Sequence, residues 1–348
     1  MYWLNTPQVR SYIAMQSTGT TRKRITRKKL EALDLPIPPL AEQQQIAAKL
    51  DELLAQVDNL KTRLDTITKI LKRFRQSVLA AAVSGKLTED WRGETTYYDL
   101  DGISIPISWK IKQAQEVCCK VQSGSTPRDN PFDQNGTIPF LKVYNIVNQK
   151  IDFNYKPQFI TKETHDKGSK RSIAYPNDVL MNIVGPPLGK VALLTDQYPE
   201  WNLNQAITFF RADDKQLNFQ YLYHVLCEGA LVRKVMPDTK GSVGQVNISL
   251  SQCREALITV PPIEEQTEIV ARVEQLFTYA EQIEQRVKDA QARVNHLTQA
   301  ILAKAFSGEL TADWRAQNPK LISGDNSAAA LLARIKAERE KIKSKKLK

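Results

Sequence analysis

Two long stretches of this chain contain neither proline nor glycine. The first runs from Ala41 to Val83 and the second from Glu264 to Phe306. Each follows a Pro-Pro pair and is followed by Ser-Gly, which is the expected punctuation at the start and end of a helix. At about 1.5 Å per residue, a helix of this length is on the order of 64 Å long. We therefore expect two long helices.

Apolar side chains recur in both stretches at alternating steps of four and three residues. The first seam consists of Ile46, Leu50, Leu53, Val57, Leu60, Leu64, Ile67, Leu71, Phe74 and Val78. The second consists of Ile269, Val273, Leu276, Ala280, Ile283, Val287, Ala290, Val294, Leu297 and Ile301. This spacing predicts a coiled coil. Matched length and register favour the two helices packing on each other rather than on separate cores.

The connection between the helices indicates their relative direction. Segment 93–247 joins the end of the first helix to the start of the second. A compact domain of that size has a radius of gyration of about 15 Å, whereas a parallel pair requires the chain to travel back the whole length of the first helix. We therefore expect an antiparallel coiled coil.

A duplicated module surrounds each expected helix. The nine residues SGKLTEDWR (84–92) return as SGELTADWR (307–315), at an offset of 223 residues. The same offset aligns PPLAEQQQI, which begins at Pro38, with PPIEEQTEI, which begins at Pro261. The similarity extends over about 68 residues, from Ile25 onward. Two copies of so long a unit indicate a duplicated module with an insertion, not a solenoid.

Each repeated nonapeptide carries a tryptophan, Trp91 in the first copy and Trp314 in the second. We expect each indole to pack over an end of the helix pair, and direct contact with a partner is the alternative.

The net charge of +11 is concentrated at the two ends of the chain. Residues 1–37 contribute +5 and residues 317–348 contribute +6, whereas segment 93–247 contributes only +1. Basic ends are weak evidence for nucleic-acid binding by themselves. No apolar run of about 18 residues and no signal peptide is present, so we expect a cytoplasmic protein that does not enter a membrane.

The cysteines, histidines and glycines of the sequence form no catalytic or metal-binding pattern. The four cysteines are Cys118, Cys119, Cys227 and Cys253, and the three histidines are His165, His224 and His296. They show no CxxC or metal-ligand spacing. No phosphate-binding glycine motif is present. The segment Gly185-Pro186-Pro187-Leu188 lacks the amide or carboxylate and the aromatic ring of an amino-methyltransferase loop. We therefore expect no enzyme activity, metal or cofactor in this chain.

Segment 93–247 has a mixed α/β pattern. Strands are expected at 138–146, 179–184, 191–194 and 206–211, and a helix is expected at 219–235. Loops rich in Gly, Ser and Pro fall at 122–131 and 239–249. Their hydroxyl, amide and basic groups suit hydrogen bonding to base edges and phosphates, although ordinary polar turns have the same composition.

The chain resembles the specificity subunit of type I restriction–modification systems. The matching stretches are GSTP (124–127), PNDVLMNIVGPPLGKVALL (176–194), LNQAITFF (203–210), NISLSQCREALITVPPIEEQTEIVARVE (247–274) and LLARIKAEREK (331–341), together with the paired PPxxEQ and SGxLTxDWR motifs. That family has a target-recognition domain, a long helix, a second recognition domain and a second helix. The resemblance covers essentially the whole chain.

The resemblance implies an α+β protein with one α/β target-recognition domain and two long helices. The implied domains are a remnant of a first target-recognition domain (1–24), a first conserved region (25–92), a target-recognition domain (93–247), a second conserved region (248–316) and a basic tail with a short helix (317–348). Residues 1–24 align with 224–247, the closing part of a recognition domain. The chain is therefore expected to begin near the end of its first domain.

The resemblance also implies a function and a set of partners. The chain is expected to read half of a bipartite target in double-stranded DNA and to dock two methyltransferase subunits on its helices. Endonuclease subunits would join through the methyltransferases, and S-adenosylmethionine and ATP would be bound by these partners. A second copy, or another chain, could supply the missing domain. The alternative is a coiled-coil adaptor whose central domain binds protein.

Loop chemistry and the resemblance together nominate residues for DNA contact. They are Ser123, Ser125, Thr126, Arg128, Lys142, Tyr144, Asn145, Lys240, Ser242, Gln245 and Asn247.

Overall fold

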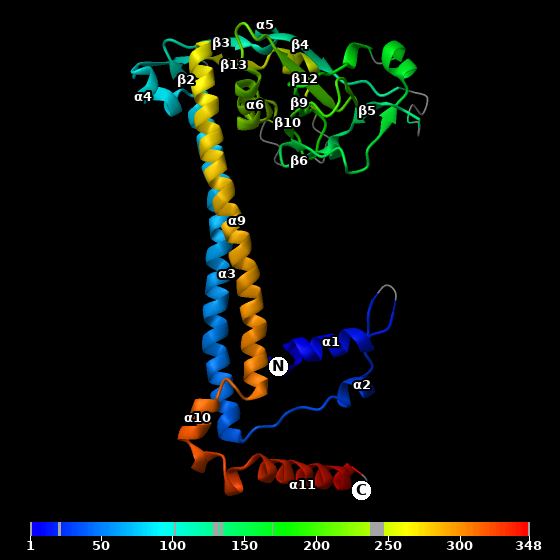
Figure 1. Cartoon of the computed structure of the whole chain (residues 1–348), viewed down its shortest axis with the longest axis vertical. Helices are drawn as coiled ribbons and strands as arrows, with labels where there is room; N and C mark the ends of the chain where they lie inside the picture. The colour runs from blue at the N-terminus through cyan, green and yellow to red at the C-terminus, as the bar shows by residue number, and fades with distance from the viewer. Residues whose placement is uncertain are drawn as a thin grey trace. The chain divides into compact units, whose positions relative to one another are not determined.

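The computed structural model describes residues 2–19, 22–100, 102–127, 132, 135–168, 170–236 and 247–346. The chain divides into two compact units: unit 1 comprises residues 1–70 and 282–348, and unit 2 comprises residues 71–281. Two long helices, α3 (Leu40–Val83) and α9 (Ile263–Ser307), contribute residues to both units (Figure 1). Their bounds lie within one residue of the expected ones, so the prediction of two long helices is confirmed.

Unit 1 is helical. Beside its parts of α3 and α9 it contains α1 (Pro7–Gln16), α2 (Arg27–Glu31), α10 (Ala312–Gln317) and α11 (Ala328–Lys346), with short 3-10 turns at Tyr2–Asn5, Pro319–Leu321 and Gly324–Asn326. The helix α11 is the short helix expected in the basic tail.

The helices α3 and α9 run antiparallel. In unit 1, Ile46 and Leu50 near the start of α3 share a core cluster with Ile301 and Leu302 near the end of α9. In unit 2, Val78 and Leu79 from the end of α3 share a core with Ile269 and Val273 from the start of α9. The direction that the connecting segment predicted is therefore confirmed.

Two seam positions are more open than the heptad spacing predicts. Leu60 is 42% exposed and Leu297 is 45% exposed, whereas Val57 is only 2% exposed. In a two-helix coiled coil, each helix is covered by its partner on one side only. An apolar residue at the flank of the seam therefore stays in contact with water.

Unit 2 contains a four-stranded sheet with the order β10-β9-β12-β4, in which all neighbouring strands are antiparallel. Its strands are β10 (Val191–Leu193), β9 (Val179–Asn182), β12 (Ile207–Ala212) and β4 (Cys118–Ser123). A second sheet has the order β11-β5-β8, with β11 (Asn202–Leu203) parallel to β5 (Ile138–Leu141) and β8 (Phe159–Ile160) antiparallel to it.

Smaller elements complete unit 2. The paired strands are β1 (Tyr97–Leu100) with β2 (Ile103–Pro106), β3 (Lys110–Gln113) with β13 (Leu257–Val260), and β6 (Ile146–Val147) with β7 (Lys150–Ile151). The helices are α4 (Glu89–Arg92), α5 (Ala114–Val117), α6 (Phe219–Glu228), α7 (Ala230–Val235) and α8 (Leu250–Arg254).

Strand β9 separates two hydrophobic cores. Its Val179 and Met181 belong to a core that also contains Tyr221 and Leu222 of α6. Figure 1 shows this helix beside the sheet. Leu180 points the other way and belongs to a second core. This alternation follows from the two-residue period of a strand, and it explains why β9 is apolar on both faces.

Two expected elements are interrupted in the structure. The strand expected at 138–146 ends at Leu141, because the side chain of Asn145 accepts a hydrogen bond from Lys142 N at 3.1 Å and closes a turn. The helix expected at 219–235 is broken between α6 and α7 at Gly229, whose φ is +90°. This left-handed conformation is the usual helix stop.

The duplication extends into elements outside the long helices. The bounds of α2 and α8 are related by the same offset of 223 residues. Both helices begin with a hydroxyl cap, Thr26 in α2 and Ser249 in α8. The similarity that is faint in sequence near Ile25 therefore corresponds to a repeated helix.

Candidate nucleic-acid interface and the repeated glutamate clusters

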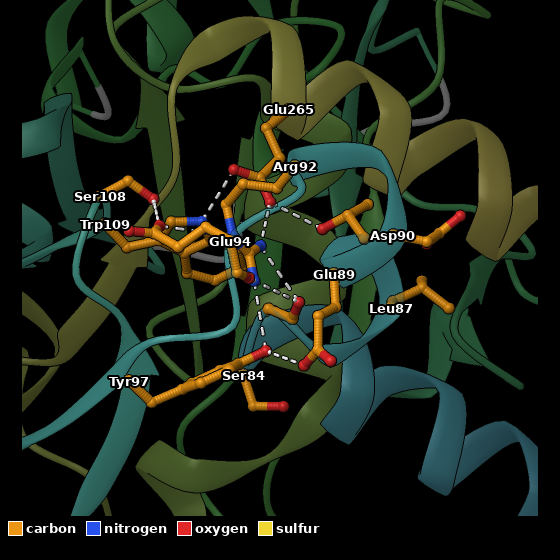
Figure 2. Close-up of polar contacts among 12 residues, drawn as sticks. Ser84, Leu87, Glu89, Asp90, Arg92, Glu94, Tyr97, Ser108, Trp109 and Glu265 are labelled. Carbon is orange, nitrogen blue, oxygen red and sulfur yellow. Dashed lines mark hydrogen bonds and ion pairs between the residues drawn. The ribbon is translucent and has the colours of Figure 1, made fainter.

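A buried glutamate near the start of α9 gathers polar groups from the first nonapeptide. Glu265 is 1% exposed. Its Oε1 accepts hydrogen bonds from Thr88 Oγ1 at 2.7 Å and from Arg92 Nη1 at 2.6 Å. Its Oε2 accepts from the indole of Trp109 at 2.9 Å (Figure 2). We call these four residues, with Gly85, the Glu265 cluster.

Arg92 connects this cluster to the chain that follows α3. Its guanidinium donates to the carbonyl of Gly85 at 3.2 Å and to the hydroxyl of Tyr97 at 3.2 Å. The Tyr97 hydroxyl in turn donates to Glu89 at 2.7 Å (Figure 2). Burial first, and then the hydrogen bond to Glu89, raise the pKa of Tyr97. Arg92 therefore binds Glu265 and also the chain before and after α4, at Gly85 and Tyr97.

Unit 1 contains the equivalent arrangement around Glu42, which is 3% exposed. Its Oε1 accepts from Thr311 Oγ1 at 2.6 Å and from Arg315 Nη1 at 2.5 Å. Arg315 Nη1 also donates to Gly308 O at 2.7 Å. Each of these residues is displaced by 223 positions from its counterpart in the Glu265 cluster. We call Glu42, Gly308, Thr311 and Arg315 the Glu42 cluster.

A further pair of contacts repeats beside the two clusters. Arg272 Nη1 donates to Leu87 O at 2.9 Å, and at the equivalent place Lys49 Nζ donates to Leu310 O at 3.2 Å. The nonapeptide is therefore repeated because each copy fastens the chain after one long helix to the first turns of the other. The offset aligns the two glutamates in sequence, but this role depends on contacts between distant residues and was not predicted from the alignment.

Of the two nonapeptide tryptophans, Trp91 differs from the expectation, and Trp314 is partly exposed. Trp91 is 47% exposed, so the expectation that it packs over the helix pair is wrong for this copy. Trp109 occupies the buried position at the Glu265 cluster instead. The neighbour of Trp91, Asp90, forms an ion pair with Arg272 at 2.6 Å, and the hydrogen bond from Arg272 lowers the pKa of Asp90. Contact with a partner remains as the alternative for Trp91.

Several segments of unit 2 meet where strands β4 and β9 of the four-stranded sheet end and strand β12 begins. Gly124 N donates to Ile207 O at 2.8 Å and Ile183 N donates to Ala206 O at 2.9 Å. Ile248 N donates to Ile183 O at 2.8 Å. We call this edge, comprising residues 123–127, 141–142, 183–189, 203–206 and 247, the loop edge. It contains parts of four of the stretches that the resemblance singled out.

Several nominated DNA contacts lie at the loop edge. Ser123 Oγ is 2.9 Å from Thr208 Oγ1, Ser125 N donates to Leu203 O, and Thr126 Oγ1 donates to Gln205 Oε1. The side chains of Ser123, Ser125, Thr126 and Lys142 are partly exposed, and Asn247 is exposed. The structure therefore brings five nominated residues together on one edge.

Asn145 is not available to read a base. It is 1% exposed, and its side-chain amide donates to Asp152 O at 3.0 Å and to Tyr155 O at 2.9 Å. We correct this nomination: Asn145 holds the turn after β5. Tyr144 lies beside it, partly exposed, and donates its hydroxyl to Lys156 O at 3.1 Å.

Arg128, Lys240, Ser242 and Gln245 lie outside the described residues. Two residues that were not nominated lie at or next to the loop edge. Asn204 has a buried side-chain oxygen with no hydrogen-bond partner among the described residues, and Lys190 follows directly after residues 183–189. Asn204 was within a quoted motif, so its amide chemistry was a signal that could have found it.

Other polar groups of the structure form internal pairs. Arg211 binds Asp178 through two hydrogen bonds of 2.8 and 2.7 Å, and His165 lies 2.9 Å from Glu200. Within the described part of the chain, no group of three or more His, Cys, Asp or Glu is placed to hold a metal ion. Among the same residues, no helix combines the length and apolar character needed to cross a membrane.

A family model described as the type I restriction modification DNA specificity domain matches residues 4–69 and 106–290. The chain belongs to this family. The type I restriction enzyme EcoBI specificity subunit of Escherichia coli is 43% identical over 344 residues, covering 96% of this chain and 70% of that protein. The EcoKI specificity subunit of Escherichia coli strain K12 is 39% identical, covering 95% of this chain and 69% of that protein. Membership identifies a specificity subunit, the non-catalytic component of its system, with no catalytic cofactor of its own.

Solved structures share the fold of this specificity subunit. A chain from a study of complex assembly and conformational transition in a type I R-M system has a TM-score of 0.70 at 20% identity, covering 88% of this chain and 70% of that chain. The HsdS subunit of Thermoanaerobacter tengcongensis has a TM-score of 0.54 at 21% identity, covering 88% and 69%. The expected α+β fold with long helices is therefore confirmed.

Proposed function

We propose that this specificity subunit reads half of a bipartite target in double-stranded DNA through the loop edge of unit 2. The observation that carries the proposal is the convergence of several segments at the loop edge, all of them within family-matched residues 106–290. The family is described as a DNA specificity domain, and the relatives are named as specificity subunits of restriction enzymes.

The loop edge has the chemistry that base and phosphate contacts require. Hydroxyls of Ser125 and Thr126 can donate and accept, the amide of Asn247 can do both, and Lys142 carries a positive charge. Backbone hydrogen bonds between the segments fix these groups in one place, which reduces the entropy lost on binding. Arg128 and Lys240 extend the proposal to loops that the sequence nominates for phosphate contact.

The duplicated module suits a partner that is present twice. We propose that each copy seats one methyltransferase subunit and that nuclease subunits join through the methyltransferases. S-adenosylmethionine and ATP would be bound by those partners. The proposed domains remain 1–24, 25–92, 93–247, 248–316 and 317–348, and the proposed compartment is the cytoplasm.

Salt-dependent binding to duplex DNA tests the proposed recognition. Phosphate contacts release counterions, so the affinity should fall steeply with salt concentration. Lys142→Ala, Arg128→Ala and Lys240→Ala should each weaken binding, and the salt slope should fall by about one for each phosphate contact that a substitution removes. Unchanged affinity in all three variants would move the interface elsewhere on unit 2.

Methylation mapping separates DNA recognition from the alternative of a protein-binding adaptor. Cells that carry this chain with its methyltransferase should show methylation at one defined sequence. An adaptor would give no sequence-specific methylation and no salt-sensitive binding to DNA.

A further inference from the structure

The turn that joins β9 to β10 contributes residues 183–189 to the loop edge, and none of its side chains is polar. The sequence of this turn is IVGPPLG. Other segments of the loop edge contribute the hydroxyls of Ser125 and Thr126, the amine of Lys142 and the amide of Asn247. The hydrogen bonds and phosphate contacts proposed above therefore leave the role of this turn unexplained.

Asn182, the last residue of β9, fixes the shape of the turn from the inside. It is 0% exposed. Its side-chain amide donates to Val184 O at 2.9 Å and to Pro187 O at 2.8 Å, and its Oδ1 accepts from Lys190 N at 2.6 Å. Val184 also forms an antiparallel bridge with Asn247. Both amide hydrogens of Asn182 are therefore used within the turn.

Close packing at two glycines restricts the turn further. A Cβ added to Gly185 would lie 2.7 Å from Leu188 Cγ. A Cβ added to Gly189 would lie 2.5 Å from Cγ2 of Val232, which belongs to α7. Because the turn is held by Asn182 and packed against α7, it loses little conformational entropy when it contacts a partner.

Pro186 and Pro187 are the central residues of the turn, and both are exposed. A proline ring carries no hydrogen-bonding group, and a proline has no backbone N–H. These two residues can therefore donate no hydrogen bond to a phosphate or to a base. Two exposed rings can make apolar contact, and the apolar group that a base presents in the major groove is the 5-methyl group of thymine.

We propose that Pro186 and Pro187 are specificity-determining residues that read a thymine of the target through its 5-methyl group, and that Asn182 positions them. The proposal rests on the DNA recognition proposed above and deepens it by naming the chemistry of one contact. A methyl group that packs on rings already held in place leaves water without ordering the turn, so the contact favours thymine over the other bases.

Replacement of thymine by uracil tests this contact, because the two bases differ only in the 5-methyl group. Methylation mapping first defines the target, and each thymine of both strands is then replaced in turn in a synthetic duplex. Binding of the full chain, measured by fluorescence anisotropy, should weaken by about fourfold for at least one thymine, the factor expected when one methyl group loses its apolar contact. A target whose thymines can all be replaced without loss, or one without an A·T pair, overturns the proposal.

A double substitution locates the contact on the turn. The variant with Pro186→Ala and Pro187→Ala should bind the thymine duplex at least about fourfold more weakly, and uracil at the responsive position should then cost nothing further. The matched control is Pro199→Ala, at an exposed proline beyond the other end of β10, and it should keep the full response to uracil. Losses that add in the double variant place the methyl contact on another residue and overturn the assignment.

Asn182→Ala tests the positioning role. The response to uracil should be lost, while the salt slope should not change, because the phosphate contacts are made by other residues. A full response to uracil in this variant would show that the prolines are held without Asn182 and would overturn its role.

Failure of this inference is distinct from failure of the proposed recognition. Salt-sensitive, sequence-selective binding of the unmodified target with no response to uracil overturns the methyl contact alone. Absence of sequence-selective binding overturns the recognition as well.

Discussion

A buried carboxylate is stable only when hydrogen bonds and an opposite charge replace the water it has lost. Glu265 and Glu42 meet this requirement with the same threonine and arginine, but the two arginines differ in exposure. The two ion pairs therefore differ in how far solvent reaches the arginine, which is buried in Arg92 and partly exposed in Arg315.

Arg92→Met should lower the free energy of unfolding by about 3 kcal/mol, because Glu265 would remain buried without its charged partner. Arg315→Met should cost about 1 kcal/mol, because that pair is partly screened by solvent. Urea denaturation followed by circular dichroism measures both, and Arg92→Lys is the control that keeps the charge. Equal losses for the two methionine variants would contradict this ranking.

His224 gives the chain an acid-sensitive site in unit 2. Burial lowers the pKa of His224 to about 4, from 6.5 for an exposed histidine. Between these values the unfolded chain binds the proton and the folded chain does not, so stability decreases as the pH falls from about 6.5 to about 4. The loss should reach about 3 kcal/mol.

Denaturation at several pH values checks this prediction. His224→Gln should remove the slope between about pH 6.5 and pH 4, while His296→Gln, at an exposed residue, should leave it unchanged. A slope that persists in His224→Gln would assign the acid sensitivity to carboxylates instead.

At the scale of elements, the features that depend on neighbouring residues, such as helix ends, could be predicted from the sequence. Pro-Pro and Ser-Gly located the ends of both long helices within one residue, and the heptad period identified their shared face. The strand expected at 138–146 was broken because the Asn145 side chain closes a turn, and apolar periodicity does not report such a bond. Likewise, the loop edge is assembled by backbone hydrogen bonds between residues far apart in sequence, so only its composition could be predicted.

The helix seam can be tested with two neighbouring residues. Val57→Asp should lower the free energy of unfolding by about 3 kcal/mol, because Val57 is 2% exposed and an uncompensated charge would enter the seam. Leu60→Asp should cost less than about 1 kcal/mol, because Leu60 is 42% exposed and the carboxylate can remain hydrated. Thermal unfolding of the two variants compares them directly, and a larger loss for Leu60→Asp would contradict the seam as described.

At the scale of the whole molecule, the same sequence module occurs twice on one polypeptide. The Glu42 and Glu265 clusters bind the two nonapeptides through equivalent threonine and arginine contacts, and each nonapeptide carries a tryptophan. Trp91 is 47% exposed next to the ion pair of Asp90 with Arg272. An exposed tryptophan beside fixed charges is typical of the residues that dominate binding energy at an interface.

If each nonapeptide contributes to a methyltransferase seat, the seats should be lost one at a time. Native mass spectrometry of the assembled complex should show two methyltransferase subunits per chain. Trp91→Ala should weaken one of them by at least about tenfold, since truncating a central interface tryptophan removes about 2 kcal/mol or more, and Trp314→Ala should weaken the other. The double variant should retain neither, whereas Tyr279→Ala, at a 61% exposed aromatic residue outside both nonapeptides, should retain both. A single substitution that released both subunits would show that the seats are coupled or shared, and full retention by the double variant would place the seats on another surface.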